Sequence, residues 1–585
     1  MRIRTGKTKN GRLFYVIKTY YDTKGIEHTV TVEKLGNEND IRERTGRDPD
    51  EWAKEYVKIL NEKEKEENRE VVVKHARNKI VPKDSPNSYN CGYLFLQYLY
   101  HNLGLDEFSR KVQKEYDIEY DFNSIFSRLI YGRILHPSSK LETSKWAATL
   151  LEQPDFSTHH VYRALDIIQQ RSDELQKALY QNSISFGGKR NTGVLYYDCT
   201  NFFYEIEEQD VDGLRKYGKS KQHQPLPIVE MGLFTDYDGI PLAMAIHPGN
   251  TNEQITLKPI EKKVITDFGL SKFIVCTDAG LCSKANKRFN TIQDRSYIVT
   301  QPIKKLKAEL KDWALAPEGW LRAGERKTRK RYNLEDLNAN ECYDAIFYKE
   351  CPVDQNSFEE RLIVTFSFKY QAYQRAIREG QIERATKAIE QGGDKLKRRN
   401  LNDYRRFIIS TSSTADGEVA DKHTYTLSEE KISEEAKYDG FYATTSDLDD
   451  NDPMDIIKVN RMRWQIEECF RIMKTEFQAR PAYVQKDNHI EAHFLTCFTA
   501  LYLYRYLEKM TKSRYTCEQI IDTLRDMRLH EIIGKGYSCD YTRTDITDEL
   551  HDAFRFRTDY EFMDRGDLKN ILHASKKVIR HAKSK

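Results

Sequence analysis

Five charged residues have the types and spacing that phosphoryl-transfer chemistry requires. Asp198 lies inside the most apolar strand-like segment of the chain, and Asp278 follows a second such segment. A buried carboxylate is costly unless a partner compensates its charge. In a later segment with helical periodicity, Arg463, Glu467 and Lys474 fall on one side of the expected helix. Three converging carboxylates can hold two Mg²⁺ ions, which activate an attacking oxygen and stabilise a leaving one.

Each acid also has a simpler explanation. Asp198 could cap a turn at the end of its strand, and Asp278 could cap a helix that begins near Ser283. Arg463 and Glu467 could form an ordinary ion pair on an amphipathic helix. The combination favours a metal site, because two acids end neighbouring strands and the third lies beside two cations. No cluster of His and Cys competes for the metal, and Mg²⁺ prefers oxygen ligands.

The segments around the acids predict a mixed sheet in an α/β fold. The expected strands are 193–206, 227–236, 240–249, 273–280 and 296–301, with a hairpin turn at 236–239 and a helix over 252–267.

The remaining segments predict further parts. Residues 12–36 read as a β-ribbon turning at Thr23–Gly25, and 37–77 as a charged helix. We expect helices over 91–183, throughout 456–507, and in the tail from 511 onward. Residues 302–440 read as an inserted, largely β module with a helix at 371–390, followed by a strand at 440–446. The resulting parts are 1–75, 76–185, 186–302, 303–440, 441–510 and 511–585.

The sequence resembles the bacterial insertion-sequence DDE transposases of the group with the YREK signature, Tyr-x2-Arg-x3-Glu-x6-Lys. Arg463, Glu467 and Lys474 match that spacing, whereas Asn460 stands in place of the tyrosine. The blocks YYDCTNFFYE, GKSKQHQPLPIVEMGLFTDYDGIPLAMAIHPGNTNE, IVCTDAGLCSKAN and YDGFYATTS resemble the other family blocks. The likeness extends to the N-terminal ribbon and covers most of the chain.

The resemblance implies an RNase H-like mixed-sheet catalytic core interrupted by a β-rich insertion, preceded by a small β-ribbon and a helical DNA-binding region. Asp198, Asp278 and Glu467 would bind two Mg²⁺ ions, with Mn²⁺ as a substitute. Water would free a 3′-OH at each element end, and that 3′-OH would attack target DNA. Partners would be terminal inverted repeats and target DNA, bound by a homodimer. Replacement of the signature tyrosine by Asn460 affects a DNA contact and not catalysis.

Basic and aromatic residues mark candidate DNA-binding surfaces. These are the signature residues Asn460, Arg463 and Lys474, the segment with Lys219 and Lys221, and the patch with Arg326, Lys327, Arg329, Lys330 and Arg331. A second basic run spans 395–406. Hairpin-forming relatives stack a flipped base on an aromatic of the insertion, and Trp313, Trp320 and Tyr332 are candidates, although core packing is the stronger expectation.

Composition limits the class of protein. The 585 residues carry 94 Lys and Arg against 91 Asp and Glu, a net charge of +3, so any DNA-binding surface must be local. No apolar segment is long enough to span a membrane, and the N-terminus has no secretory signal. The ten cysteines show no metal-site spacing and read as reduced thiols, which predicts a cytoplasmic protein. The resemblance implies that it is bacterial and associates with the nucleoid when bound to DNA.

Three other functions remain open at this stage. A catalytically silent DNA-binding descendant would have lost an acid or a signature cation. A plain RNase H-like nuclease would leave the insertion and the helical region unexplained. A glycosidase would also use paired carboxylates but would be indifferent to EDTA.

Overall fold

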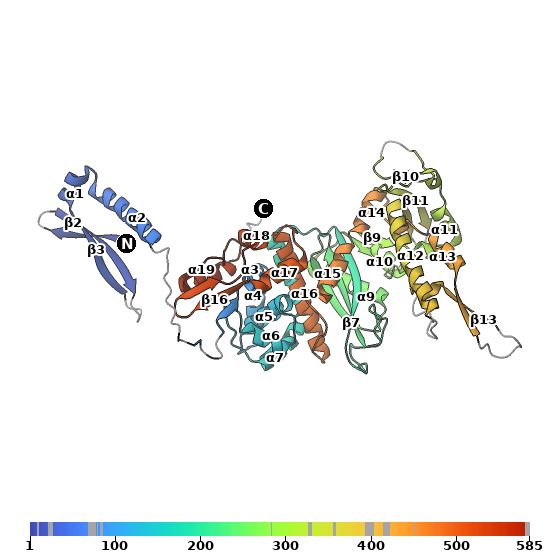
Figure 1. Cartoon of the computed structure of the whole chain (residues 1–585), viewed down its shortest axis with the longest axis horizontal. Coiled ribbons are helices and arrows are strands. Elements are labelled where there is room, and N and C mark those ends of the chain that lie inside the picture. Colours follow the sequence, from blue (N-terminus) through green and yellow to red (C-terminus); the bar gives the residue numbers. More distant parts are fainter. Residues whose placement is uncertain are drawn as a thin grey trace. The chain divides into compact units, whose positions relative to one another are not determined.

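The structure is a computed structural model of the chain, and the chain forms two compact units (Figure 1). The described residues are 1–8, 11–21, 27–67, 78, 80–81, 83, 86–281, 283–325, 330–354, 358–391, 403–413, 422–449 and 451–579. The first unit holds residues 1–85 and 532–537, and the second holds 86–531 and 538–585.

The first unit is a three-stranded antiparallel sheet covered on one side by two helices. Its elements are β1 (Arg2–Thr8), β2 (Gly11–Tyr21), β3 (Glu27–Asn37), α1 (Glu38–Thr45) and α2 (Pro49–Glu67). Phe14 and Val16 pack on Ile41 and Val57. The predicted ribbon is present, and the predicted single helix is two, because Gly46 ends α1 in the left-handed conformation at φ 67°. The predicted turn at Thr23–Gly25 lies outside the described residues.

A nine-stranded sheet organises the second unit, in the order β10-β11-β12-β15-β9-β8-β5-β6-β7. The strands that the sequence predicted for the core are β5 (Val194–Phe203), β6 (Ile228–Asp236), β7 (Pro241–Pro248), β8 (Phe273–Thr277) and β9 (Arg295–Thr300). β5, β6 and β7 are antiparallel neighbours, and β8 and β9 continue from β5 in parallel. This order and polarity are those of an RNase H-like core.

Helices cover both faces of this core. α8 (Ser172–Gly187) and α9 (Glu253–Phe268) pack on one face, where Leu257 and Ile260 contact Leu195 and Tyr197. α14 (Pro453–Arg461), α15 (Trp464–Lys474) and α16 (Asp487–Met510) cover the other face. Because side chains alternate along a strand, Asp198 points away from α9 and toward the α14–α15 side. Each large apolar side chain buried here contributes about 1.5–3 kcal/mol.

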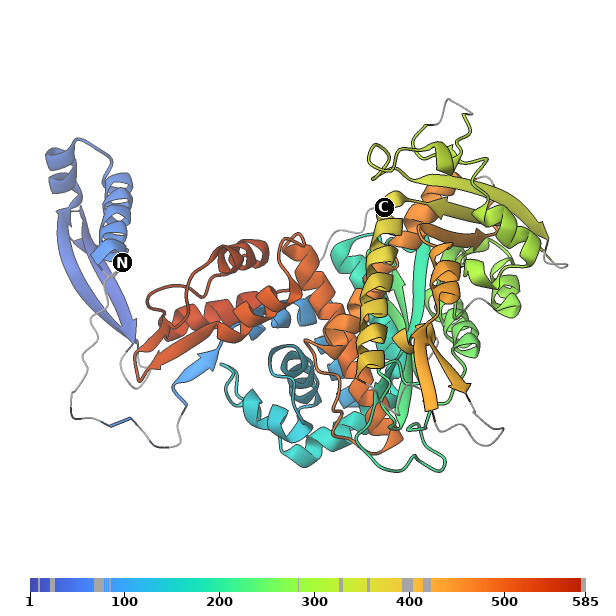
Figure 2. The ribbon, with the colours of Figure 1, turned by 45° about the vertical axis from the view of Figure 1, so that its right-hand side comes forward.

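The insertion extends the core sheet. β10 (Leu321–Arg322), β11 (Phe347–Asp354) and β12 (Glu359–Phe366) join the core through β15 (Phe441–Ser446), which pairs with β9. Its other elements are η1 (Ile303–Lys305), α11 (Ala308–Leu315), η2 (Leu334–Asp336), α12 (Phe368–Glu390), η3 (Tyr404–Phe407), β13 (Ile408–Ser413), β14 (Lys422–Leu427) and α13 (Glu429–Ala436), whereas α10 (Lys284–Asn290) belongs to the core and packs on α9 and β9. The long helix α12 lies against η3 and β14 (Figure 2).

The predicted helical region forms one body with the C-terminal tail. Its elements are β4 (Ser88–Asn90), α3 (Tyr93–Asn102), α4 (Leu105–Glu115), α5 (Phe122–Leu135), α6 (Lys140–Ala147) and α7 (Thr158–Gln170). The tail adds α17 (Cys517–Asp526), β16 (Arg528–Ile532), β17 (Gly536–Cys539), α18 (Asp545–Phe554) and α19 (Arg565–Ser575). α16 packs on α3, α5 and α7, and α19 packs on α3.

Two predictions about helices are wrong. Residues 456–507 are not helical throughout, since 475–486 separate α15 from α16. Pro481 lies in this break, and a proline disfavours helix at its own position and at the one before it. The tail is not entirely helical either, because β16 pairs with β4, more than 400 residues away in sequence, and with β17.

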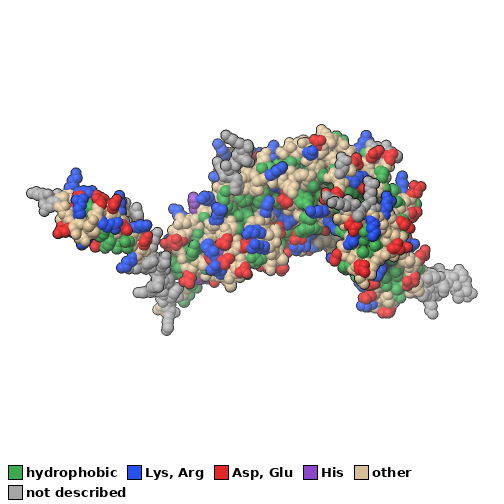
Figure 3. Space-filling model, turned by 90° about the horizontal axis from the view of Figure 1, so that it is seen from above, with side chains coloured by type: hydrophobic (Ala, Val, Ile, Leu, Met, Phe, Trp, Pro, Cys, Tyr) green, Lys and Arg blue, Asp and Glu red, His purple; other side chains and the backbone are tan. Residues whose placement is uncertain are grey.

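The distribution of charge over the surface and the hydropathy of the helices agree with the expectations drawn from the composition. Lys and Arg alternate with Asp and Glu over the face drawn in Figure 3, without a large region of one sign. Among the helices that the structure describes, none has the length and apolar character needed to cross a bilayer.

Candidate active site

Asp198 and Asp278 lie side by side because β5 and β8 run parallel in a fixed register. Tyr197 of β5 pairs with Thr277 of β8, so the next residue along each strand is one of the two aspartates. The sequence predicted both acids at the ends of neighbouring strands. The structure brings them together at the same level of the sheet.

Asp198 is a carboxylate held partly out of water. Its Oδ1 accepts a hydrogen bond from the backbone N–H of Cys199 at 2.8 Å. Burial raises the pKa of Asp198 to about 6; Lys221 opposes this shift, and the negative charge of Asp278 adds to it. An acid with a raised pKa beside a second acid is a candidate for cation binding.

Asp278 keeps one oxygen free of backbone contacts among the described residues. Its Oδ1 accepts from the backbone N–H groups of Gly280 at 2.9 Å and Leu281 at 3.2 Å. The alternative that Asp278 caps the following helix is wrong, because Ser283 is the N-cap of α10. The small side chains after Asp278 leave this turn open.

Glu467 lies in the first turn of α15 and is 61% exposed. Its Oε1 is 3.6 Å from Nη2 of Arg463. Arg463 is mostly buried, donates to Oγ1 of Thr300 at 3.3 Å, and interacts electrostatically with Asp198 and Asp278. Arg463 therefore links the helix acid to the two strand acids.

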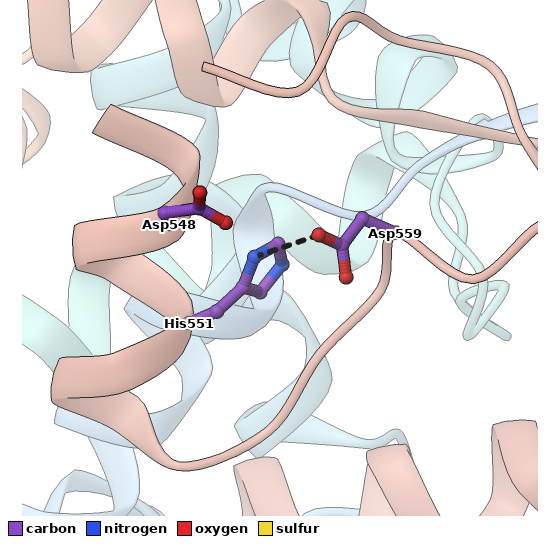
Figure 4. A group of neighbouring side chains, drawn as sticks. All are labelled: Asp548, His551 and Asp559. Atoms are coloured by element: carbon purple, nitrogen blue, oxygen red, sulfur yellow. Dashed lines mark ion pairs between the residues drawn. The ribbon is translucent and has the colours of Figure 1, made fainter. Parts of the chain in front are cut away.

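The three predicted acids do not form a tight set. Among the described residues, the His, Cys, Asp and Glu ligand atoms that all lie within 4.8 Å of one another belong to Asp548, His551 and Asp559 instead (Figure 4). Glu467 extends toward solvent and Arg463.

Two lysines approach the strand acids from different elements. Nζ of Lys474 donates to Oγ1 of Thr200 at 2.6 Å. Burial, with smaller contributions from Lys221 and Arg480, lowers the pKa of Lys474 to about 8. Nζ of Lys221 donates to the carbonyl oxygen of Cys199 and is 3.0 Å from Oε1 of Glu253.

A cleft of about 1350 Å³ opens beside Asp278. One wall comes from the core, with the segment 218–225 and the N-terminus of α9. The other wall comes from the insertion, with Gln381 and Arg384 of α12 and with residues 403–405. The predicted residues Lys219 and Lys221 line this cleft. The cleft therefore places the insertion opposite the acids of the core.

Sequence reasoning missed two acids in this cleft, Glu230 and Glu253. Glu230 of β6 is 3% exposed and interacts electrostatically with Glu253, the first residue of α9. Burial and the charge of Glu253 raise the pKa of Glu230 to about 8. A lone glutamate inside the apolar strand 228–236 was the available signal.

Asn460, which replaces the tyrosine of the signature, lies in the interior at 3% exposure. Its Nδ2 donates to the hydroxyl of Tyr442 at 2.9 Å and to Oγ1 of Thr444 at 3.2 Å. Its Oδ1 accepts from Sγ of Cys276 at 3.5 Å. These contacts join α14 to β15 and β8, and they leave little of the side chain for DNA.

The predicted basic patches lie partly outside the described residues. Arg326, Lys327 and Arg329 are among those not described, and so is 395–400. Lys330 and Arg331 are exposed. In the second run, Arg406 is paired with Glu435 and Arg405 with Asp403, so these two arginines serve ion pairs within the insertion.

The aromatic candidates of the insertion belong to its core. Trp320 is fully buried and its Nε1 donates to the carbonyl of Ala316 at 2.9 Å. Trp313 and Tyr332 pack against the same cluster. The structure therefore shows these three aromatic side chains packed in the core of the insertion, which was the stronger of the two expectations.

One of the comparisons with known proteins shows the family of this chain. No curated protein matches the chain. A solved structure, the cryo-EM structure of the piggyBac transposase synaptic complex with hairpin DNA, is similar over 84% of this chain and 86% of that chain, at 8% identity and a TM-score of 0.33. The sequence profile of the family described as "Transposase DDE domain" matches residues 203–503, more than half of the chain, which include Asp278 and Glu467. The chain therefore belongs to the DDE-domain transposases.

Proposed function

We propose that this transposase cuts both ends of its element and joins the freed 3′-OH ends to target DNA. Asp198, Asp278 and Glu467 would be the catalytic residues and would hold two Mg²⁺ ions, for which Mn²⁺ would substitute. The observation that carries the proposal is the matched register of Asp198 and Asp278 on parallel strands, with α15 on the same face. Hydrolysis breaks the P–O3′ bond, and the leaving oxygen takes a proton.

The donor set fits a hard divalent cation. Backbone amides orient one oxygen of Asp198 and of Asp278, and the described part of the chain places no thiol or imidazole among the three acids. When bound, the two ions would activate the attacking oxygen and stabilise the leaving one in an in-line displacement.

The cations around the acids would position DNA. Arg463 and Lys474 lie close to the strand acids. One DNA phosphate held by both side chains would place the adjacent phosphate of the same strand at Asp198. A bound phosphate would also keep Lys474 protonated, which its burial opposes. Lys219 and Lys221, on the wall of the cleft, would hold the same strand further along. Lys330 and Arg331 extend this role to the insertion.

The partners follow from the reaction. The enzyme would recognise terminal inverted repeats and target DNA, and two chains would act together, because both ends must be cut in one complex. A bacterial cytoplasm, with association to the nucleoid, is the matching location. The resemblance of the sequence to insertion-sequence enzymes supports this origin.

Plasmid cleavage tests the proposal. The substrate carries the DNA that flanks the gene, and the reaction is run with Mg²⁺, Mn²⁺ or EDTA. We expect metal-dependent breaks at two inverted sequences for the wild type and none for Glu467→Gln. Glu468→Gln is the matched control, because Glu468 is the next residue of α15 and pairs with Arg471 at 2.6 Å. Cleavage by Glu467→Gln at the wild-type rate would refute the three-acid site. Binding without cleavage under any metal would favour a silent DNA-binding descendant.

A further inference from the structure

We propose that the sheet of the first unit binds duplex DNA with the face that its helices leave uncovered. The inference rests on the proposed function, since it assigns a DNA surface to a part of the chain far in sequence from the acids. No role was predicted for this unit from the sequence beyond a ribbon and a charged helix. We call the face opposite α1 and α2 the open face.

Register and alternation define which side chains belong to the open face. Phe14 and Val16 of β2 point to the helices, so their neighbours in the strand point to the open face. Cα partners share a face, and Tyr15 pairs with Arg4 on one side and with Lys34 on the other. The described members of the open face are Arg2, Arg4, Leu13, Tyr15, Ile17, Thr19, Thr29, Thr31 and Lys34.

The charged side chains that the structure describes on the open face are all cations. Arg2, Arg4 and Lys34 are exposed, and no ion pair joins them to a described side chain. Among the members of this face whose side chains the structure describes, none is acidic. Three free cations over three adjacent strands form a positive surface within a chain that is almost neutral overall.

The helix side of the same unit carries charges of both signs. Arg12 is paired there with Glu38 and Asp50, and Lys18 with Glu64. The hydroxyl of Tyr56 donates to Glu33 at 3.0 Å. α1 and α2 also carry further acids on their exposed sides. The acids whose side chains are described in this unit therefore gather on the helix side, and the partner that this asymmetry fits is an extended polyanion on the open face.

The dimensions of the open face suit a DNA groove. Three strands about 4.8 Å apart span about 10 Å, and the major groove is about 12 Å wide. Strands are known to read DNA in either groove. The arginines can pair with phosphates or with guanine edges, and the hydroxyls of Thr29 and Thr31 can donate to phosphate oxygens.

Salt-dependent binding of the full-length protein tests the open face. The probes are a duplex from the DNA flanking the gene and a random duplex of equal length. The variant is R2A/R4A/K34A, and the matched control is K54A/K58A/K63A, which removes three exposed lysines from α2. Each phosphate contact adds about 0.9 to the slope of log K against log salt concentration.

We expect the open-face variant to lose up to about 2.7 of that slope and at least about tenfold in affinity, with the control near wild type. Wild-type affinity and slope in R2A/R4A/K34A would overturn the inference, as would equal losses in the control. Plasmid cleavage separates this result from the proposed function. If the wild type binds DNA through the open face but never cleaves, the proposed chemistry fails and the inference stands. If the wild type binds neither duplex, both fail.

Discussion

Two groups of side chains in this molecule could offer ligand atoms to a metal ion, and they lie in different surroundings. Asp548, His551 and Asp559 have ligand atoms within 4.8 Å of one another, which is tighter than the set of Asp198, Asp278 and Glu467 (Figure 4). We call the first group the C-terminal cluster and the second the core acids. By proximity alone, the C-terminal cluster would be the better metal site.

Arginines already neutralise the C-terminal cluster. Arg557 contacts Asp548 at 2.7 Å and Asp559 at 2.6 Å, and Arg543 contacts Asp548 at 2.8 Å. Hydrogen bonds from Arg543 and then Arg557 lower the pKa of Asp548 to about 2. Burial instead raises the pKa of Asp198 to about 6. These opposite shifts indicate that the charge of Asp548 is compensated more fully than that of Asp198, which Lys221 and Arg463 offset only in part.

The histidine of the C-terminal cluster is also oriented away from metal binding. Its Nε2 accepts a hydrogen bond from the backbone N–H of Thr558 at 3.2 Å. A neutral ring must then carry its proton on Nδ1, which points to Asp559 at 3.6 Å. A protonated nitrogen has no lone pair for a metal. Charge balance and proton position, more than the spacing of ligand types, decide which cluster can take a cation.

The largest expected difference between the two groups is in catalysis. Asp278→Asn should lower the rate of plasmid cleavage by at least about a thousandfold, equivalent to about 4 kcal/mol of barrier. Asp559→Asn should leave the rate within about threefold, because the arginines and not a metal are its partners. Rates are measured on the same flanking-DNA plasmid. A large loss in Asp559→Asn with a normal melting temperature would contradict the comparison.

Neutralising one aspartate in each group should change the free energy of unfolding in opposite directions. Asp198→Asn removes a carboxylate whose raised pKa shows that the fold disfavours its charge at pH 7, so unfolding should cost about 1 kcal/mol more. Asp559→Asn removes charge-assisted bonds to Arg557 and should cost about 1–2 kcal/mol of stability. Thermal unfolding at pH 7 measures both. Destabilisation by Asp198→Asn would show that its charge is compensated after all.

The smallest expected effect is a weak metal site gained by removing the arginines. In R543Q/R557Q the carboxylates of Asp548 and Asp559 lose their counter-charges, and the pKa of Asp548 should rise toward its ordinary value. We expect this variant to bind an additional Mn²⁺ ion at millimolar concentration, as measured by electron paramagnetic resonance. The tautomer of His551 limits the affinity. No additional ion at any concentration would mean that charge balance is not what separates the two groups.

The core and its acids were predictable because they depend on local patterns. Apolar strands that end in Asp198 and Asp278, and the helical spacing of Arg463, Glu467 and Lys474, are visible in the sequence. The order of the strands then follows from ordinary packing of such segments. The described strands of the core lie within three residues of the predicted ones.

The remainder depends on contacts between distant segments. Asn460 is buried because β8 and β15 meet α14, which no local pattern reveals. Glu230 has its pKa raised because α9 brings Glu253 to it. The pairing of β16 with β4 joins the two ends of the helical body. The arginines of the C-terminal cluster act in the same way, since Arg543 and Arg557 meet only through the fold of the tail.

Counting bound Mn²⁺ ions tests the central claim most directly. The wild type, Asp198→Asn and Asp559→Asn are titrated with Mn²⁺ and followed by electron paramagnetic resonance. The account predicts two ions for the wild type and for Asp559→Asn, and the loss of at least one ion for Asp198→Asn. Two ions retained by Asp198→Asn, together with an ion lost from Asp559→Asn, would contradict it and move the metal site to the C-terminal cluster.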